Sequence, residues 1–295
     1  MKLSIMVLAR NSERTVEKCL SSIINAPKGD FEVEEYIIVD GGSTDRTLQI
    51  VAKFPISHII KDVRGRGRGR EVGWRKASSD FVCFFDSDLV IRSDWFIEQS
   101  KAINQYPDAD VWYGRVDTPS DVKSNIAKMS GVEYTYYQDR IRGKGSVNRY
   151  GCDTSNTIFR RDILQRVGGF NVRLPFSEDA DVGHRIWKSG GRIVLWQDAK
   201  ALHYHRETLS KKLRQNFEFG YGTAYLLSTL KDYPKPWTMY LLLPYSIPKF
   251  AIIWSRKYGL IGFGAAWLYL LKRFAFLCGY LYAKLTGCKL MEEER

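Results

Sequence analysis

Short apolar runs alternate with helical patterns in the first third of the chain, and this alternation most constrains the fold. The runs at residues 3–9, 35–39, 56–60 and 81–85 are mostly apolar and are predicted to be buried strands. Between them, as in residues 16–24, apolar residues recur at helical spacing. Apolar strands that alternate with helices are typical of a parallel sheet covered on both faces. We therefore predict an α/β fold with a mainly parallel central sheet.

Acidic residues stand directly after two of these strands. Asp40 follows the second strand, and Asp86 and Asp88 follow the fourth in the sequence Asp-Ser-Asp. Ligands of parallel α/β sheets bind at the carboxyl ends of the strands. Paired carboxylates there suit a divalent cation whose oxygen shell is completed by phosphates, although an isolated Asp-x-Asp is also typical of a capped turn. No Gly-x-Gly-x-x-Gly follows the first strand, which argues against an ordinary dinucleotide-binding domain.

The second half of the chain offers further titratable residues. Glu178 and Asp179 begin a predicted helix over residues 178–188, where carboxylates are stabilised as anions. They could simply cap this helix, or Asp179 could act as a general base toward an acceptor hydroxyl. His203 and His205 are predicted to share one face of a strand, either as metal ligands or as half-buried structural residues.

Six motifs, taken in order, carry a resemblance to a known family. They read VLARN, IIVDGGSTDRT, REVGWRKASSDFVCFFDSD, SNTIFRRDILQRVGGF, SEDADVGHRIWKSGGRI and ALHYHR. Together they resemble the family-2 glycosyltransferases with the GT-A nucleotide-sugar-binding fold, over roughly residues 3–225. The resemblance is specific because all six motifs occur in the expected order and spacing. The resemblance implies an inverting, metal-dependent hexosyltransferase of the membrane-associated prokaryotic type.

The resemblance also implies roles for individual residues. The nucleotide pocket would be lined by Ala9, Arg10 and Asn11, with Asp40 hydrogen-bonded to the base, expected to be uracil, and Arg70 near the same nucleotide. The metal, Mg²⁺ or Mn²⁺, would be held by Asp88, Asp86 and His203, with Asp86 also near the ribose and His205 as a weaker candidate. Asp179 would be the catalytic base with Glu178 beside it, Asn156 would lie in the acceptor-side loop, and Arg185 is expected to contact the donor.

The implied reaction moves a sugar from a nucleotide-diphosphate sugar, expected to be a UDP-sugar, to a hydroxyl of a glycan or a lipid-linked glycan. Two alternatives stay open, a transferase acting on polyprenyl phosphate and a non-catalytic nucleotide-sugar-binding scaffold. The first motif reads LARN where many relatives have a Pro-Thr-Tyr-Asn-like turn, and Glu71 stands where many have Asn.

Positive charge is concentrated in two places. The formal net charge is +12, and one basic stretch covers residues 61–76. Within it, the arginine–glycine run at residues 64–70 is expected to be a loop, either solvated or closing over the donor diphosphate. Such a run can also bind RNA, but RNA-binding segments of this kind are usually long and disordered. We therefore predict no nucleic-acid partner.

The second basic region is the C-terminal tail, which has no Asp or Glu from residue 233 to residue 291. Its change in composition predicts a GT-A domain over residues 1–232 and a helical, membrane-associating region over 233–295. Apolar segments at 237–254 and 258–282 could lie in the membrane interface, span as a hairpin, or pack as ordinary core helices. Basic flanks fit an anionic leaflet. Because the N-terminus lacks a signal-peptide pattern, we expect the cytoplasmic face of the cell membrane.

Overall fold

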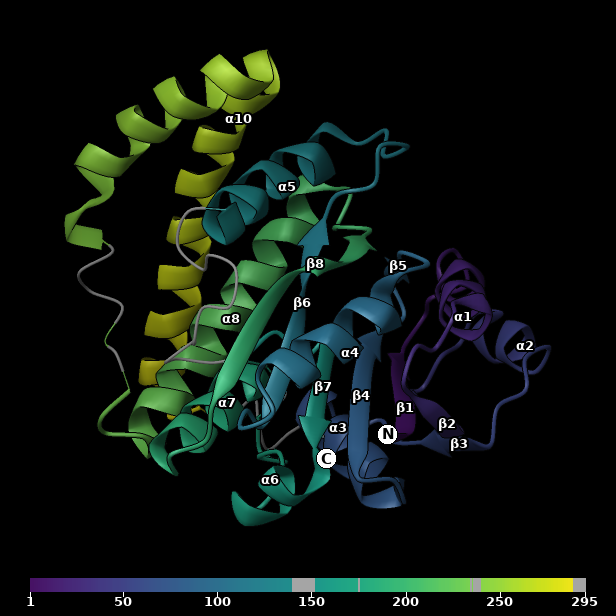
Figure 1. Ribbon diagram of the computed structural model, residues 1–295. Coiled ribbons are helices and arrows are strands. Elements are labelled where there is room, and N and C mark those ends of the chain that lie inside the picture. The colour runs from purple at the N-terminus through teal and green to yellow at the C-terminus, as the bar shows by residue number, and fades with distance from the viewer. Residues whose placement is uncertain (140–151, 175, 234, 236–239, 289–295) are drawn as a thin grey trace. The chain divides into compact units, whose positions relative to one another are not determined.

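The computed structural model describes residues 1–139, 152–174, 176–233, 235 and 240–288 (Figure 1). It divides into two compact units. Unit 1 comprises Met1–Val116 with Arg142–His203, and unit 2 comprises Asp117–Ile141 with Tyr204–Arg295. Segments on both sides of residues 232 and 233 belong to unit 2, and the predicted domain boundary at that point stays a prediction.

The described elements follow one another along the chain with helices between most of the early strands. They are β1 (Lys2–Ala9), α1 (Val16–Asn25), β2 (Glu32–Asp40), α2 (Thr47–Val51), β3 (His58–Lys61), α3 (Arg66–Lys76), β4 (Phe81–Asp86), β5 (Leu89–Ile91), α4 (Trp95–Gln105), β6 (Val111–Asp117), α5 (Asn125–Tyr137), β7 (Asn156–Arg160), α6 (Arg161–Arg166), α7 (Glu178–Lys188), β8 (Ile193–His203), α8 (Leu209–Thr229) and α10 (Leu243–Thr286).

A mixed sheet of eight strands, in the order β3-β2-β1-β4-β7-β6-β8-β5, forms the centre of unit 1. Strands β3, β2, β1 and β4 are parallel neighbours. Strand β7 runs antiparallel to both β4 and β6, and β5 runs antiparallel to β8. The predicted α/β class is confirmed, and the four strands that the apolar runs indicated are parallel neighbours in the sheet.

Both faces of the sheet are covered by helices, as the apolar strands require. On one face, Met6, Phe84 and Phe159 belong to a core that also takes in Trp74 from α3 and Ile186 from α7. On the other face, Phe85 packs against Trp95 of α4 with ring centroids 4.9 Å apart. Burial of a large side chain contributes about 1.5–3 kcal/mol, so these two layers hold the strand ends that carry the site.

The arginine–glycine run is helical, and the expectation of a loop is wrong for residues 66–70. Helix α3 begins at Arg66, after Gly65 in a left-handed conformation with φ 98°. A Cβ atom at Gly67 would lie 2.4 Å from the carbonyl oxygen of Leu174, and one at Gly73 would lie 2.8 Å from the side chain of Met6. The glycines therefore allow α3 to pack closely against the sheet and the segment before α7. These contacts offset the poor helix propensity of glycine, which costs about 1 kcal/mol per residue relative to alanine.

Unit 2 is built mainly from helices α5, α8 and α10. Helices α8 and α10 approach closely, because a Cβ at Gly220 would lie 1.9 Å from the carbonyl oxygen of Phe276 and one at Gly279 equally near that of Phe217. Helix α10 bends at Gly259, which has the non-helical angles φ 58° and ψ −138°. The bend divides α10 into a first arm up to Tyr258 and a second arm from Leu260. These arms correspond to the two apolar segments of the predicted tail.

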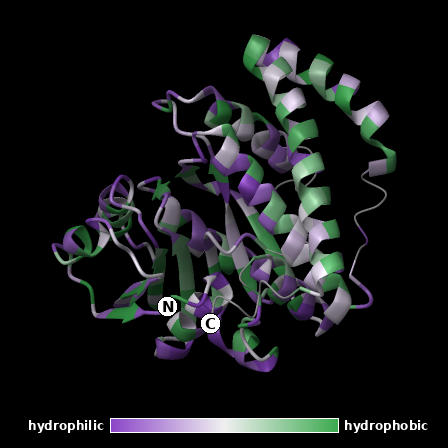
Figure 2. Ribbon diagram, turned by 180° about the vertical axis from the view of Figure 1, so that it is seen from behind, coloured by the Kyte–Doolittle hydropathy of each residue, from purple (hydrophilic) through white to green (hydrophobic). Residues whose placement is uncertain are grey.

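The second arm of α10 has two adjacent basic residues in the middle of its apolar sequence. Lys272 and Arg273 point inward and pair with Glu133 of α5. By length and composition, α10 could cross a membrane. Hydrophobic residues recur along both arms, at the right of Figure 2. Twelve large apolar side chains between Leu241 and Leu285 are exposed, so much of this apolar surface is not covered within the described chain.

Candidate active site

The ends of three parallel strands bring the predicted donor residues to one edge of the sheet. In the strand register, Ala9 of β1 lies beside Asp40 of β2, and Leu8 lies beside Asp86 of β4. Ala9 is buried, whereas Arg10 and Asn11 are exposed just beyond it. The side-chain oxygen of Asn11 accepts a hydrogen bond from the backbone N–H of Thr44 at 2.8 Å. The loops after β1 and β2 are thus joined at the edge where a ligand of such a sheet would bind.

Asp40 is fully buried and organises the loop that follows it. Its carboxylate accepts hydrogen bonds from the backbone N–H of Gly42 at 3.2 Å and from both the N–H and the hydroxyl of Ser43. Its predicted hydrogen bond to the base stays a prediction. The contacts observed give Asp40 a second role, since they hold the shape of the loop.

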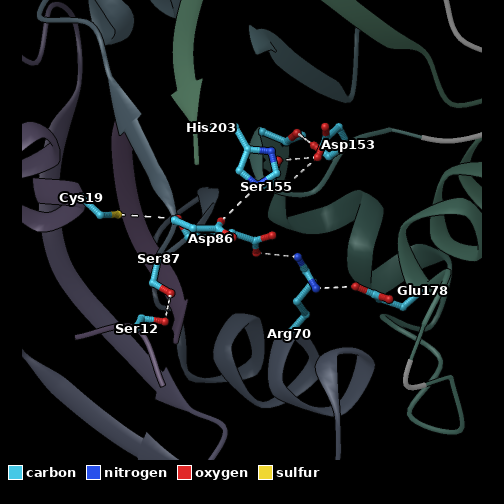
Figure 3. A network of polar contacts seen from close by, with 11 residues as sticks. Ser12, Cys19, Arg70, Asp86, Ser87, Asp153, Ser155, Glu178 and His203 are labelled. Atoms are coloured by element: carbon cyan, nitrogen blue, oxygen red, sulfur yellow. Dashed lines mark hydrogen bonds and ion pairs between the residues drawn. The ribbon is translucent and has the colours of Figure 1, made fainter. Parts of the chain in front are cut away.

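Arg70 of α3 is the central cation of the site. It is only 3% exposed, and it donates hydrogen bonds to Glu178 on one side and to Asp86, at 2.8 Å, on the other (Figure 3). Burial by itself would lower the pKa of Arg70, but the surrounding carboxylates of Asp86, Glu178, Asp179 and Asp153 raise it. One guanidinium thus joins the end of β4 to the start of α7.

Asp88 and His203 face each other across the β5–β8 pair. The Oδ1 atom of Asp88 lies 3.3 Å from Nε2 of His203, and each side chain is about one-fifth exposed. Burial alone would lower the pKa of His203, but the carboxylates of Asp88, Asp153 and Asp86 raise it. Burial, together with the charges of Asp88 and Asp153, raises the pKa of Asp86 against the opposite effect of Arg70. The carboxylates of Asp86, Asp88 and Asp153 therefore give an excess of negative charge around His203.

These residues fit a divalent cation by their chemistry. Two carboxylates and an imidazole are ligands that Mn²⁺ accepts, and a cation between Asp88 and His203 would relieve the carboxylate repulsion that raises the pKa of Asp86. Among the described residues, no group of three or more acidic, His or Cys side chains is arranged to hold a metal, because Asp86 is turned toward Arg70. Mg²⁺ at nucleotide sites commonly uses one or two carboxylates and the phosphates of the substrate, so two protein ligands are sufficient.

The predicted catalytic pair begins α7, as the sequence indicated. Ser177, just before the helix, has a left-handed φ of 63°, which is uncommon for a residue with a side chain. Glu178 is 4% exposed and pairs with Arg70. Asp179 is half-buried. Burial and the neighbouring charges of Glu178 and Asp153 raise the pKa of Asp179 to about 7. A carboxyl with such a pKa can take up a proton near neutral pH, as a general base requires.

Three residues that were predicted to belong to the site either form hydrogen bonds within the fold or lie in another part of it. Arg185 donates hydrogen bonds to Asp181 and to the carbonyl oxygens of Val167 and Gly169, which gives it a structural role; its donor contact stays a prediction. Asn156 does not lie in a loop, because it begins β7, has no exposed surface and donates to the carbonyl oxygen of Arg115. His205 does not share a strand face with His203, since β8 ends at His203 and His205 belongs to unit 2.

Two further residues shape the site although the sequence predicts no role for either of them. The negative charge of Asp153 helps to raise the pKa values of Asp86, Asp179 and His203. Its Oδ1 atom accepts a hydrogen bond from the N–H of Ser155 at 3.0 Å (Figure 3). The only hint is its place just before a predicted strand. Glu71 is buried, and one of its carboxylate oxygens accepts hydrogen bonds from Trp74 Nε1 and from the backbone N–H of Phe170. It thereby ties α3 to the turn that precedes α7.

Known structures share this fold. The chain superposes on the crystal structure of S. aureus TarS with a TM-score of 0.56 at 19% identity, covering 95% of this chain and 54% of that one. A TarS fragment in complex with UDP-GlcNAc gives 0.55 at 18% identity, covering 97% and 92%. The mannosyltransferase PcManGT from Pyrobaculum calidifontis, in complex with GDP-Man and Mn²⁺, also gives 0.55 at 18% identity, covering 97% and 74%. The fold, with acidic residues at its strand ends, is that of the GT-A class.

The family follows from the sequence comparison. Residues 4–168 match the model of the glycosyl transferase family 2, and the chain belongs to this family. Among curated relatives, the poly(ribitol-phosphate) beta-N-acetylglucosaminyltransferase TarS of Staphylococcus aureus is 34% identical over 215 residues, which is 69% of this chain and 35% of the relative. The poly-beta-1,6-N-acetyl-D-glucosamine synthase of Staphylococcus epidermidis is 27% identical over 82% of this chain and 60% of the relative. The chain thus spans between about a third and three-fifths of these relatives.

Proposed function

We propose that this protein is an inverting, metal-dependent glycosyltransferase that moves a sugar from a UDP-sugar to a hydroxyl of a glycan or polyol acceptor. The observation that carries the proposal is the chain of contacts from Asp86 through Arg70 to Glu178, beside Asp179. These contacts link the strand end with Asp86 to the start of α7, where the pKa of Asp179 is raised to about 7. A sugar transfer needs a group that binds the departing diphosphate and a carboxyl that accepts the proton of the attacking hydroxyl.

In the proposed reaction, Asp179 takes the proton of the acceptor hydroxyl. The acceptor oxygen forms a bond to the anomeric carbon while the bond from that carbon to the diphosphate oxygen breaks, and the nucleoside diphosphate leaves. Displacement from the opposite face turns an α-linked donor into a β-linked product. Asp88 and His203 would hold the divalent cation, whose chemistry is to neutralise the diphosphate charge. Arg66, which acts electrostatically on Asp86 and is only partly buried, would face the same phosphates.

The donor proposal is supported by the relatives. A β-N-acetylglucosaminyl transferase is among them, and a fragment of similar fold is known with UDP-GlcNAc. UDP-GlcNAc is therefore the first donor to test. The experiment is a panel of nucleotide sugars with Mn²⁺ or Mg²⁺, in which UDP-GlcNAc should protect the protein from thermal unfolding only when the metal is present, and transfer should be seen with a hydroxyl acceptor. Protection without the metal, or binding of every nucleotide sugar with no transfer to any acceptor, would contradict the proposal.

We also propose that unit 2 associates with the cytoplasmic face of a membrane that contains anionic lipid. Seven exposed apolar side chains of the second α10 arm recur three, four or seven residues apart and so share one helix face: Leu260, Phe263, Trp267, Leu271, Phe274, Leu281 and Leu285. We call this face the apolar stripe. It contains no charged residue. Of the three basic residues within its span, Lys272 and Arg273 pair with Glu133 on the inner side, and Lys284 is exposed near the end of the helix. The remaining charges between residues 233 and 291 are all basic, which suits anionic lipid.

A further inference from the structure

A buried carboxylate of α3 holds the turn at residues 167–170, which leads toward α7. The side chain of Glu71 is 7% exposed. Its Oε2 atom accepts hydrogen bonds from the backbone N–H of Phe170 at 2.8 Å and from Nε1 of Trp74 at 2.6 Å. The turn passes so close that a Cβ atom at Gly169, whose φ is 75°, would clash with the same oxygen. Glu71 therefore fixes the backbone of this turn.

Arg185 of α7 holds the same turn from the other side. Its guanidinium donates hydrogen bonds to the carbonyl oxygens of Val167 and Gly169, the latter at 2.8 Å. It also pairs with Asp181, one helical turn earlier in α7, which keeps the arginine side chain in place. Glu71 thus accepts an N–H of the turn while Arg185 donates to two of its carbonyls, so the turn links α3 to α7.

Helix α7 is consequently attached to α3 at two points. Its first residue, Glu178, pairs directly with Arg70. Near its other end, Arg185 is joined through the turn to Glu71, the next residue of α3. Glu178 and Arg185 are seven residues apart, which is about 10 Å along a helix. One attachment fixes a point of the helix, whereas two fix the direction of its axis, and Asp179 lies between them.

We propose that Glu71 is a positioning residue for the reaction, which sets the place of the Asp179 carboxyl through the turn and Arg185. The inference rests on the proposed transferase function, in which Asp179 takes the proton of the acceptor. A catalytic group must be held within about 0.5 Å of its productive position, and a displacement of about 1 Å can cost on the order of 100-fold in rate. The contacts of Glu71 with the turn supply part of this precision.

Kinetics of the full chain with UDP-GlcNAc, Mn²⁺ and a hydroxyl acceptor test the proposal. Glu71→Met keeps the length of the side chain but accepts neither hydrogen bond, so kcat should fall roughly tenfold to 100-fold while donor affinity changes less than about twofold. Glu71→Gln retains an acceptor oxygen and should keep kcat within about threefold. Arg75→Met is the matched control, because it removes an exposed partner of Glu71 and leaves the contacts of the turn in place.

The pH profile separates positioning from a merely structural role. Burial and the charges of Glu178 and Asp153 raise the pKa of Asp179 to about 7, against the opposite effect of Arg70. When the turn is released in Glu71→Met, Asp179 should gain contact with water, and the inflection of kcat/KM should move to lower pH. Arg185→Met releases the turn from the other side and should give the same shift, which keeps the test available if Glu71→Met does not fold.

Two kinetic results would overturn the positioning role and leave the transferase. One is an unchanged kcat and inflection in folded Glu71→Met, measured below its thermal midpoint, which would make Glu71 a residue of stability alone. The other is a loss of donor affinity as large as the loss of kcat, which would place the action of Glu71 on the donor side.

A double-mutant cycle decides the proposal even in a chain that transfers no sugar. Asp179→Asn should raise the thermal midpoint at pH 8, because the variant lacks a carboxyl that resists ionisation. In the Glu71→Met background this gain should shrink to less than about half, whereas in the Glu71→Gln background it should persist. Such coupling without any transferase activity supports the positioning of Asp179 and contradicts the proposed function. Additive effects of Glu71→Met and Asp179→Asn overturn the positioning role, whatever the activity.

Discussion

The guanidinium of Arg70 forms a buried ion pair with the carboxylate of Glu178, 108 residues further along the chain. The same guanidinium reaches Asp86, so the strand end that faces the donor and the helix that carries Asp179 share one cation. When one partner of a buried pair is removed, the other is left as an uncompensated charge. The Arg70–Glu178 pair therefore makes the geometry of the site sensitive to single substitutions.

Arg70→Met should destabilise the protein by about 3 kcal/mol, because Glu178 and Asp86 lose their common counter-charge in a buried setting. The double variant Arg70→Met/Glu178→Gln should recover part of this loss, since one of the two stranded charges is then removed. Denaturant unfolding followed by circular dichroism measures both. A double variant no more stable than Arg70→Met would show that the pair is not what holds α3 to α7.

Asp179→Asn should lose nearly all transfer while binding the donor as before, because the carboxyl acts on the acceptor. Loss of a positioned general base costs roughly 10²–10⁴ in rate. If donor affinity collapses together with transfer, Asp179 belongs to the donor site or to the fold. If transfer to a polyprenyl phosphate survives, the acceptor is already an anion and the proposed hydroxyl acceptor is wrong.

The same variant should be more stable than the unaltered chain at alkaline pH. The raised pKa of Asp179 means that the folded protein binds more protons than the unfolded chain between pH values of roughly 4 and 7. The unfolding free energy therefore falls as pH rises through this window, and the loss is complete above pH 7. Asp179→Asn has no carboxyl to titrate and avoids this loss of stability. The thermal midpoint of the variant should therefore exceed that of the unaltered chain by about 2–4 °C at pH 8 and by less at pH 5. If the thermal midpoint of Asp179→Asn were lower than that of the unaltered chain at pH 8, the environment of Asp179 would not disfavour its charged form.

The transfer rate should depend on pH through the same group. A general base works deprotonated, so with metal and donor saturating, kcat/KM for the acceptor should rise up to about pH 7 and then level off. Below the inflection the rate should fall about tenfold per pH unit. A profile that is flat between pH 5.5 and pH 8 would rule out Asp179 as the titrating base.

Asp88→Asn should abolish metal-dependent nucleotide binding and lower activity at least about a hundredfold, because the cation would lose its main carboxylate ligand. The fold should persist, since Asp88 is about one-fifth exposed and pairs only loosely with His203. Asp94→Asn is the control, as Asp94 is a half-buried carboxylate that pairs with Arg92 and lies outside the site. Full Mn²⁺-dependent turnover by purified Asp88→Asn would remove Asp88 from the metal site.

Charges placed in the apolar stripe should release the protein from membranes. Trp267 and Phe274 are 54% and 66% exposed, so Trp267→Glu/Phe274→Glu should fold normally and no longer sediment with vesicles that contain anionic lipid. Point substitutions are preferable to truncation near residue 231, because α10 also packs on α5 and α8 within unit 2. Ile59→Glu, at an exposed apolar residue of unit 1, should sediment like the unaltered chain. Unchanged sedimentation of the double variant would mean that the stripe does not meet the lipid.

Local sequence patterns were sufficient to predict the strands and the helix that position the site. The apolar runs of β1, β2 and β4, the acidic residues at the ends of β2 and β4, and the start of α7 at Glu178 could all be predicted, because strand period, helix period and capping residues act over a few neighbours. The order of six motifs was sufficient for the family, which the match over residues 4–168 confirms. The roles of single residues within the site stay predictions.

What tertiary structure decided is how distant charges meet. Close packing at the glycines of α3, such as that of Gly67 against the carbonyl of Leu174, accommodates the arginine–glycine run as a helix from which Arg70 reaches Glu178. Only the approach of α5 to α10 turns Lys272 from a charge inside an apolar segment into the partner of Glu133, 139 residues away. Sequence patterns report on neighbours along the chain, whereas the energy of a buried charge depends on the groups that folding places around it, and those come from anywhere in the chain.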